Sequence, residues 1–173
     1  MEEIGSGDPV LDLKIKVQKP FLVFPGEETE RRFLFLSNFD QNLVFTVETL
    51  HLFGKLGGWD DVAEIVASAL RKLLVPYDYT AGRLALNSEE GRLEIDCNGE
   101  GALFAAATSE LTLAQLPDIG YPNPAFAQLI LQEYGAQKLQ DLPLLFIQVC
   151  IYFHALTRKL YGDIVAYLFP KKT

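Results

Sequence analysis

Apolar and polar residues alternate over residues 11–20, and this period of two is typical of a half-buried β-strand. The apolar positions of this stretch are Leu11, Leu13, Ile15 and Val17. Residues 43–53 are rich in β-branched and aromatic side chains, which also favours a strand. We therefore expect two strands before the first helix.

Residues 59–74 have the spacing of an amphipathic helix. The apolar positions that share one helical face are Val62, Ile65, Val66, Ala69, Leu70 and Leu73. Asp60 and Asp61 lie at the positive end of the helix dipole, and Arg71 and Lys72 lie at its negative end. Pro76 cannot continue the hydrogen-bonding pattern, so we expect the helix to end before it.

Three strands are expected after this helix, over residues 82–86, 91–97 and 102–108. The tetrapeptides Asn-Ser-Glu-Glu and Asn-Gly-Glu-Gly join them, and Asn98-Gly99 is a strong signal for a tight turn. A short helix should follow over residues 108–116, with Thr108 or Ser109 as its N-cap.

The final third of the chain predicts one more helix, a buried strand and an amphipathic tail. Residues 123–135 favour a helix that starts with Asn123 and Pro124 and ends at Gly135. Residues 142–153 are almost continuously apolar, as in an inner strand buried on both faces. Apolar residues at four-residue spacing in the tail favour a helix that covers part of this strand; they are Leu156, Leu160, Ile164 and Leu168. The overall order predicts an α/β or α+β domain built on a mixed sheet with packed helices.

Composition and charge exclude several classes of function. The net charge of −8 argues against binding to nucleic acid or to an anionic membrane surface, which both require basic residues. The longest apolar run, residues 142–156, is too short to cross a bilayer. Cys97 and Cys150 match no metal-binding spacing, so no metal site is expected. The acidic amino terminus lacks the apolar segment of a signal peptide, which favours the cytoplasm.

Four stretches in order along the chain resemble the BAHD acyl-CoA-dependent acyltransferases of plants. FLSNFDQN at residues 35–42 is similar to members that feruloylate or caffeoylate long-chain hydroxy acids and fatty alcohols. The other stretches are ALRKLLVPYDYTAGRL (69–84), GRLEIDCNGEGALF (91–104) and LPLLFIQV (142–149). One departure lies inside a motif, where Asp78, Tyr79 and Thr80 replace the usual Tyr, Pro and Leu.

This resemblance implies the N-terminal part of a chloramphenicol-acetyltransferase-like two-domain fold. We expect an N-terminal strand segment at 1–18, a partial BAHD domain at 19–153 and a divergent tail at 154–173. Family members use the His of an HxxxDG motif as general base and carry a later DFGWG motif, and neither occurs in these 173 residues. His154 lies too early and is followed at the fourth position by Arg158, and His51 lies within a strand. No catalytic residue is predicted.

The resemblance implies transfer of a hydroxycinnamoyl or related acyl group from CoA to a long-chain alcohol or hydroxy acid. Acyl-CoA would be a co-substrate, with no bound cofactor. Thr29, Arg31 and Phe33 align with a segment that lines the acceptor side of the substrate channel in the family. The chain is expected to be a truncated form that is inactive alone and self-associates through its apolar inner strand. The alternative is a non-catalytic accessory or binding protein in fatty-acid, wax or suberin metabolism.

Overall fold

A computed structural model describes residues 10–42, 47–53, 62–118, 123–131, 139–152 and 163–168. The strands are β1 (Ile15–Val17), β2 (Phe21–Val23), β3 (Phe33–Phe35), β4 (Thr49–Leu52), β5 (Arg83–Asn87), β6 (Arg92–Asp96), β7 (Ala102–Ser109), β8 (Phe146–Tyr152) and β9 (Asp163–Leu168). The helices are α1 (Val62–Leu73) and the 3₁₀ helices η1 (Asp40–Asn42), η2 (Asp78–Ala81), η3 (Leu113–Gln115), η4 (Pro124–Leu129) and η5 (Leu139–Asp141).

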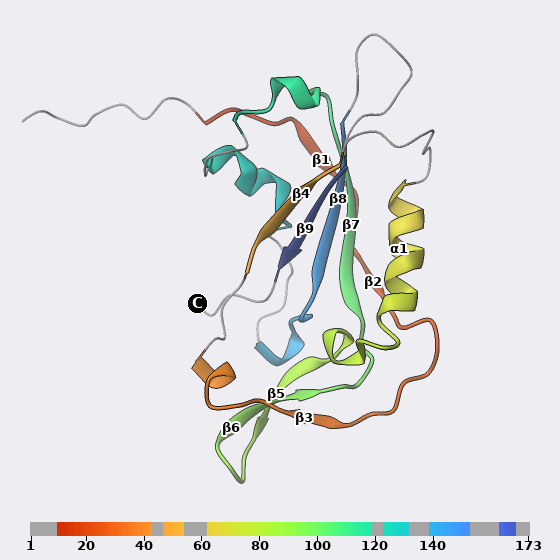
Figure 1. The fold of residues 1–173 in the computed structure, drawn as a ribbon, viewed down its shortest axis with the longest axis vertical. Helices are drawn as coiled ribbons and strands as arrows, with labels where there is room; N and C mark the ends of the chain where they lie inside the picture. The colour runs from red at the N-terminus through yellow and green to blue at the C-terminus, as the bar shows by residue number, and fades with distance from the viewer. Residues whose placement is uncertain are drawn as a thin grey trace, which may run out of the picture.

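Two sheets organise these strands (Figure 1). The larger sheet is mixed and has the order β1-β7-β8-β9-β4, with β2 also paired to β7. The smaller sheet is antiparallel and has the order β3-β6-β5. The predicted mixed α/β class is confirmed.

The strand predicted at residues 11–20 is shorter than expected, since only β1 lies within it, and a second short strand, β2, follows Pro20. β1 pairs with the carboxyl half of β7 and β2 with its amino half, and both pairings are antiparallel. Pro20 lies between them and has no amide hydrogen to donate to a ladder, which explains the interruption. β1 and β2 therefore form a single broken edge strand along β7.

The apolar segment near the carboxyl end forms an inner strand, as predicted. β8 runs parallel to β7, from Leu103 opposite Phe146 to Ser109 opposite Tyr152, and its other edge pairs with β9. Six of its seven residues are buried. The parallel arrangement requires a long crossover, which the segment between the two strands supplies together with η3, η4 and η5.

The turn predicted at Asn98-Gly99 joins two strands that do not pair with each other. The chain turns there, with Gly99 at φ 70° and Gly101 at φ 90°. The turn moves the chain from one sheet to the other, however, since β6 pairs with β3 and β5 whereas β7 enters the larger sheet. A Cβ at Gly101 would lie 2.6 Å from the carbonyl oxygen of Val23. Glycine therefore permits both the turn and the close approach to β2.

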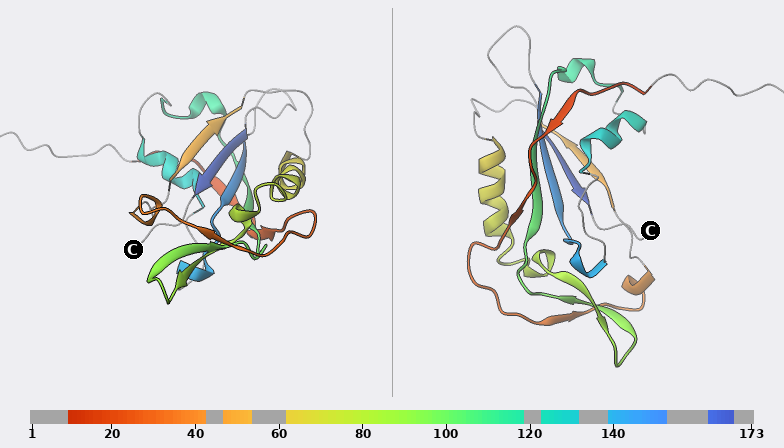
Figure 2. Two further views of the ribbon diagram at one scale, coloured as in Figure 1. Left: turned by 60° about the horizontal axis from the view of Figure 1, so that its bottom comes forward. Right: turned by 180° about the vertical axis from the view of Figure 1, so that it is seen from behind.

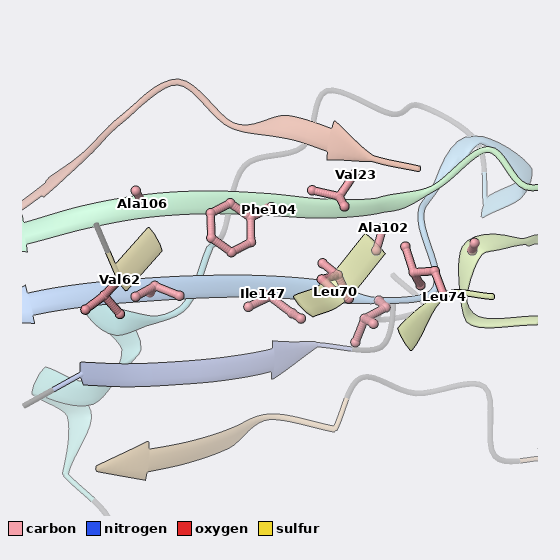
Figure 3. Packing of buried hydrophobic residues seen from close by; sticks show 11 residues of the cluster. Val23, Val62, Leu70, Leu74, Ala102, Phe104, Ala106 and Ile147 are labelled. Carbon is pink, nitrogen blue, oxygen red and sulfur yellow. The ribbon is translucent and has the colours of Figure 1, made fainter. Parts of the chain in front are cut away.

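Helix α1 covers one face of the larger sheet, and η4 lies on the opposite side (Figures 1 and 2). The end of α1 before Pro76 agrees with the prediction. The helix is described from Val62, and its predicted start at residues 59–61 lies outside the described residues. Its buried side chains pack on β2, β7 and β8 (Figure 3). This core contains Val23, Val62, Leu70, Leu74, Ala81, Ala102, Phe104, Ala106, Leu145, Ile147 and Val149.

The opposite face of the sheet is covered by the crossover. η4 begins as predicted, because the side chain of Asn123 accepts a hydrogen bond from the backbone amide of Ala125 and Pro124 occupies the first turn. The helix ends at Leu129, earlier than predicted, and Gly135 lies outside the described residues. The core on this side contains Leu13, Ala107, Ala125, Leu129, Cys150 and Tyr152.

Two further helix predictions need correction. Thr108 and Ser109 belong to β7 and cap no helix, and η3 starts four residues after Ser109. The Ser109 hydroxyl instead donates to the Leu13 carbonyl oxygen at 2.6 Å and accepts from the Leu111 amide at 3.1 Å. In the tail, residues 163–168 form the strand β9. The four-residue spacing predicted a helix there, but pairing with β8 and β4 makes this segment a strand. Residues 153–162 lie outside the described part of the chain.

Gly82 permits the close turn from η2 into β5. A Cβ at this position would lie 2.4 Å from the carbonyl oxygen of Asp96, well inside van der Waals contact. The backbone of β5 can therefore approach β6 closely only because this residue has no side chain.

Two adjacent leucines at the end of α1 should differ sharply in their contribution to stability. Leu73 is the last residue of the helix, and Leu74 follows it. Leu74 is fully buried, whereas Leu73 is 46% exposed. Replacing Leu74 by Ala should lower the free energy of unfolding by about 2–5 kcal/mol, because it leaves a cavity in the core. Leu73→Ala is the matched control and should change it by less than about 1 kcal/mol. Urea unfolding followed by circular dichroism measures both values, and equal losses would contradict this account of the core.

Candidate functional site

The three residues that align with the acceptor side of the family's channel lie along one end of β6. Phe33 is opposite Asp96 in the β3–β6 ladder and is 59% exposed. Arg31 contacts the same aspartate, and the hydroxyl of Thr29 lies beside Gly99, 3.6 Å from the position a Cβ would take there. The fold thus brings all three to one edge of the small sheet. Their role in a substrate channel stays a prediction.

Arg31 and Asp96 form a bidentate ion pair. The Nε of Arg31 lies 3.0 Å from Oδ1, and its Nη2 lies 2.7 Å from Oδ2. Asp96 also faces Arg83 across the β5–β6 ladder. Arg83 is buried, and its guanidinium donates to the carbonyl oxygens of Gly82 and Gly101 at 2.7 and 2.8 Å. Arg83 therefore fastens the start of β5 to the turn that leads into β7.

Arg32 forms a second bidentate ion pair, with the carboxylate of Asp78. Its Nη2 donates to the Oδ1 of Asp78 at 2.9 Å, and its Nη1 donates to Oδ2. The side chain of Asp78 is only 10% exposed. Hydrogen bonds from Arg32 hold the pKa of Asp78 below its usual value, against the opposing effect of burial. Asp78 is therefore ionised at neutral pH and has no proton to give to a substrate.

This ion pair explains the departure from the family motif. Asp78 stands where the resemblance leads one to expect Tyr, and a buried carboxylate requires a partner. Arg32 supplies that partner from 46 residues earlier in the chain. The acidic residue at position 78 could be noticed in the sequence as a departure from the motif. Its partner, Arg32, could be identified only from the fold.

The FLSNFDQN stretch folds into a compact turn that is fastened to β6. The Asp40 carboxylate accepts from both the backbone amide and the hydroxyl of Ser37, at 3.0 and 2.7 Å. The side-chain amide of Gln41 pairs with the backbone of Leu93 in β6, as a neighbouring strand would. Its Oε1 accepts from the Leu93 amide at 2.9 Å, and its Nε2 donates to the Leu93 carbonyl oxygen at 2.7 Å. This stretch therefore fixes the position of β3 on β6, a role that sequence reasoning missed.

Within the described residues, the candidate site contains no arrangement for metal binding. No group of three or more His, Cys, Asp or Glu side chains is close enough to hold a metal ion there. His51 lies exposed in β4, with its ring 6.4 Å from the ring of Phe53. His154 lies outside the described residues, so its predicted structural role is not tested. The described helices include none that is long and apolar enough to span a membrane.

The Arg32–Asp78 pair predicts how stability depends on pH. Because the folded pKa of Asp78 lies below its unfolded value of about 3.9, the pair stabilises the fold above about pH 4. That contribution is lost as the pH falls through the folded pKa. Asp78→Asn should therefore be less stable than the unaltered chain at pH 7, and the difference should shrink towards pH 3.

Urea unfolding at several pH values measures this difference. Glu89→Gln is the matched control, because Glu89 is an exposed carboxylate in the turn between β5 and β6. Its stability curve should follow that of the unaltered chain. A stability difference for Asp78→Asn that stays constant from pH 7 to pH 3 would show that the ion pair does not contribute as described.

Comparison with known proteins agrees with this fold and its motifs. The model of the Transferase family matches residues 13–153. The acyltransferase GLAUCE of Arabidopsis thaliana is 45% identical over 141 residues, which are 80% of this chain and 31% of that protein. Omega-hydroxypalmitate O-feruloyl transferase of the same plant is 33% identical over 141 residues, again 80% of this chain and 31% of that protein. The chain thus spans about a third of the length of these relatives.

A solved structure supports the same fold. Vinorine synthase superimposes with a TM-score of 0.65 at 16% identity, over 90% of this chain and 37% of that protein. The match includes the mixed sheet and its packed helices, so the predicted similarity to this fold is confirmed. The family match extends over most of the chain and includes all four motifs read from the sequence. The chain therefore belongs to the Transferase family, the BAHD acyltransferases.

Proposed function

We propose that this chain forms part of an acyltransferase that moves an acyl group from CoA to a hydroxyl acceptor. The observation that carries the proposal is the family match over residues 13–153, with relatives whose names describe acyl transfer. A hydroxycinnamoyl donor and a long-chain alcohol or hydroxy acid acceptor fit the similarity to the feruloyl transferase and to fatty alcohol:caffeoyl-CoA acyltransferase. Acyl-CoA acts as co-substrate, and the protein works in the cytoplasm.

The described residues supply a scaffold for this reaction. Asp78 and Asp96 are each held by an arginine, so both carboxylates serve as anchors of the scaffold. The exposed ring of Phe33 and the hydroxyl of Thr29 offer an apolar surface and a hydrogen-bonding group to an acceptor. We assign residues 19–153 to the family domain, with 1–18 and 154–173 as flanking segments. The 173 residues contain no HxxxDG motif, so proton removal from the acceptor requires a residue outside them.

A chimeric enzyme tests this function. Residues 13–153 would replace the matching stretch of omega-hydroxypalmitate O-feruloyl transferase, and transfer from feruloyl-CoA to omega-hydroxypalmitate would be measured. The reference is a variant of the parent enzyme in which the His of the HxxxDG motif is changed to Ala. We expect the chimera to transfer the acyl group at least 100-fold faster than this variant, because a general base contributes about 10²–10⁴ in rate. The 173-residue chain alone should show only background. A folded chimera that neither binds feruloyl-CoA nor transfers the acyl group would contradict the proposal.

The same chimera tests the channel residues. Phe33→Ala should raise the KM for omega-hydroxypalmitate about two- to tenfold, because it removes apolar contact with the acceptor, while the KM for feruloyl-CoA stays unchanged. Phe39→Ala is the matched control, because Phe39 is also an exposed phenylalanine, in the turn after β3. Equal effects of the two substitutions would show that Phe33 does not line the acceptor side of the channel.

A further inference from the structure

Strand β1 lies at one edge of the larger sheet, and within the described residues β7 is its only strand neighbour. The Gln18 amide donates to the Ala106 carbonyl oxygen at 2.8 Å, which identifies the residues of this segment that bond to β7. Backbone groups of alternate residues point to opposite sides of a strand. Those of Lys16 therefore also point to β7, whereas those of Ile15 and Val17 point away from it. β1 thus presents backbone donors and acceptors at the outer edge of the sheet.

A groove of about 870 Å³ lies between this edge and the end of η4 (Figure 2). Every residue from 14 to 20 lines one side, so the edge strand itself forms that wall. The apolar side chains of Ile130 and Leu131 lie in the opposite wall. The Gln128 Oε1 accepts from the Leu13 amide at 2.9 Å, which holds η4 beside the segment that leads into β1. The groove is therefore a built feature of the fold.

The side chains of β1 alternate between two surroundings. Ile15 packs against the core on the η4 side, and Val17 lies opposite Ala107, which belongs to that core. Val17 is nevertheless 45% exposed. Lys16 lies between them, so it points to the other face, where it pairs with Glu110. A strand beside β1 would therefore meet apolar side chains at two positions and a lysine at the position between them.

The charge of the groove favours an acidic partner, although the chain as a whole has a net charge of −8. The charged residues that line it are Lys14, Lys16, Lys19, Asp12 and Glu110. Lys14 and Lys16 each have a carboxylate partner, whereas Lys19 forms no ion pair in the part of the chain that the structure describes. The ammonium group of Lys16 has three donors, so it can bind a second carboxylate. Two lysines along this edge are therefore open to a partner's acidic side chains.

We propose that this groove binds an extended polypeptide segment, which adds to the larger sheet as a further strand beside β1. The segment has an acidic residue between two apolar ones. The backbone of the apolar residues bonds to Ile15 and Val17, and their side chains lie against Ile130 and Leu131. The acidic side chain lies at Lys16.

The charges of β1 argue against a second copy of the same strand in this position. Two copies of β1 side by side would bring their lysines together, and like charges on neighbouring strands are destabilising. The proposal goes beyond acyl transfer and does not depend on it. None of Thr29, Arg31 and Phe33 lines the groove, so it is a different site from the proposed channel.

NMR titration of the ¹⁵N-labelled 173-residue chain with synthetic peptides tests the proposal. The probe is acetyl-Glu-Val-Glu-Val-Glu-amide, whose sequence reads the same in both directions and so fits either strand orientation. We expect a Kd below about 1 mM, with the largest shifts at the amides of Ile15 and Val17. The basic peptide acetyl-Lys-Val-Lys-Val-Lys-amide should bind about three- to tenfold more weakly, because its charges match those of the groove.

Backbone methylation of the probe distinguishes strand addition from other modes of binding. The two valines donate to β1, so N-methylation of both should weaken binding at least about tenfold by removing two hydrogen bonds. The amide of the central glutamate points away from β1. N-methylation of that residue is the matched control and should change the affinity less than about twofold.

Two substitutions test the same contacts from the side of the protein. Val17→Pro removes the outward amide and leaves the bond from Gln18 to Ala106, so it should abolish binding without changing the circular dichroism spectrum. Lys16→Glu should weaken binding of the acidic probe and strengthen binding of the basic one. Lys72→Glu, on the exposed side of α1, is the matched control and should change neither affinity.

Two results would overturn the proposal. One is the absence of binding by the acidic probe at about 1 mM. The other is an equal loss of affinity for the two kinds of N-methylated probe. If Val17→Pro does not fold, the comparison of these probes on the unaltered chain still tests strand addition.

Discussion

The parallel pairing of β7 with β8 is the constraint on which the rest of this structure depends. Two parallel neighbours cannot be joined by a tight turn, so the chain must leave Ser109 and return to Phe146 across one face of the sheet. That return path carries η3, η4 and η5 and covers the face that α1 leaves open. This path also places the end of η4 beside β1, the edge strand that pairs with β7, and a groove lies between them.

Small side chains on β7 allow both layers to approach it. Four alanines fall within the eight residues of this strand, and all of them are buried. Ala102 and Ala106 lie in the core under α1, while Ala107 lies in the core on the crossover side. Phe104 fills the space between the first two, which keeps the packing on the α1 side dense. A strand with large residues at every position would hold the two layers farther apart.

Local patterns in the sequence predicted most individual elements, whereas the partners of those elements came only from the fold. The period of α1 and the cap at Asn123 are encoded within a few residues, so they were read correctly. The turn at Gly99 was also recognised, but whether a turn joins paired strands depends on residues far away. The same limit applies to the sites, because Arg32 lies 46 residues from Asp78 and Gln128 lies 115 residues from Leu13. No short window of sequence contains either contact.

The broken edge strand has a consequence for the synthesis of the protein. β1 and β2 are made early, but Phe21 pairs with Phe104, about eighty residues later. At about 5–20 residues per second, this delay lasts about 4–16 seconds on the ribosome. Throughout that interval the edge strand has no ladder partner, and its apolar residues are available to other nascent chains or to chaperones. The order of translation therefore leaves the first strands of this domain without a ladder partner until β7 has been made.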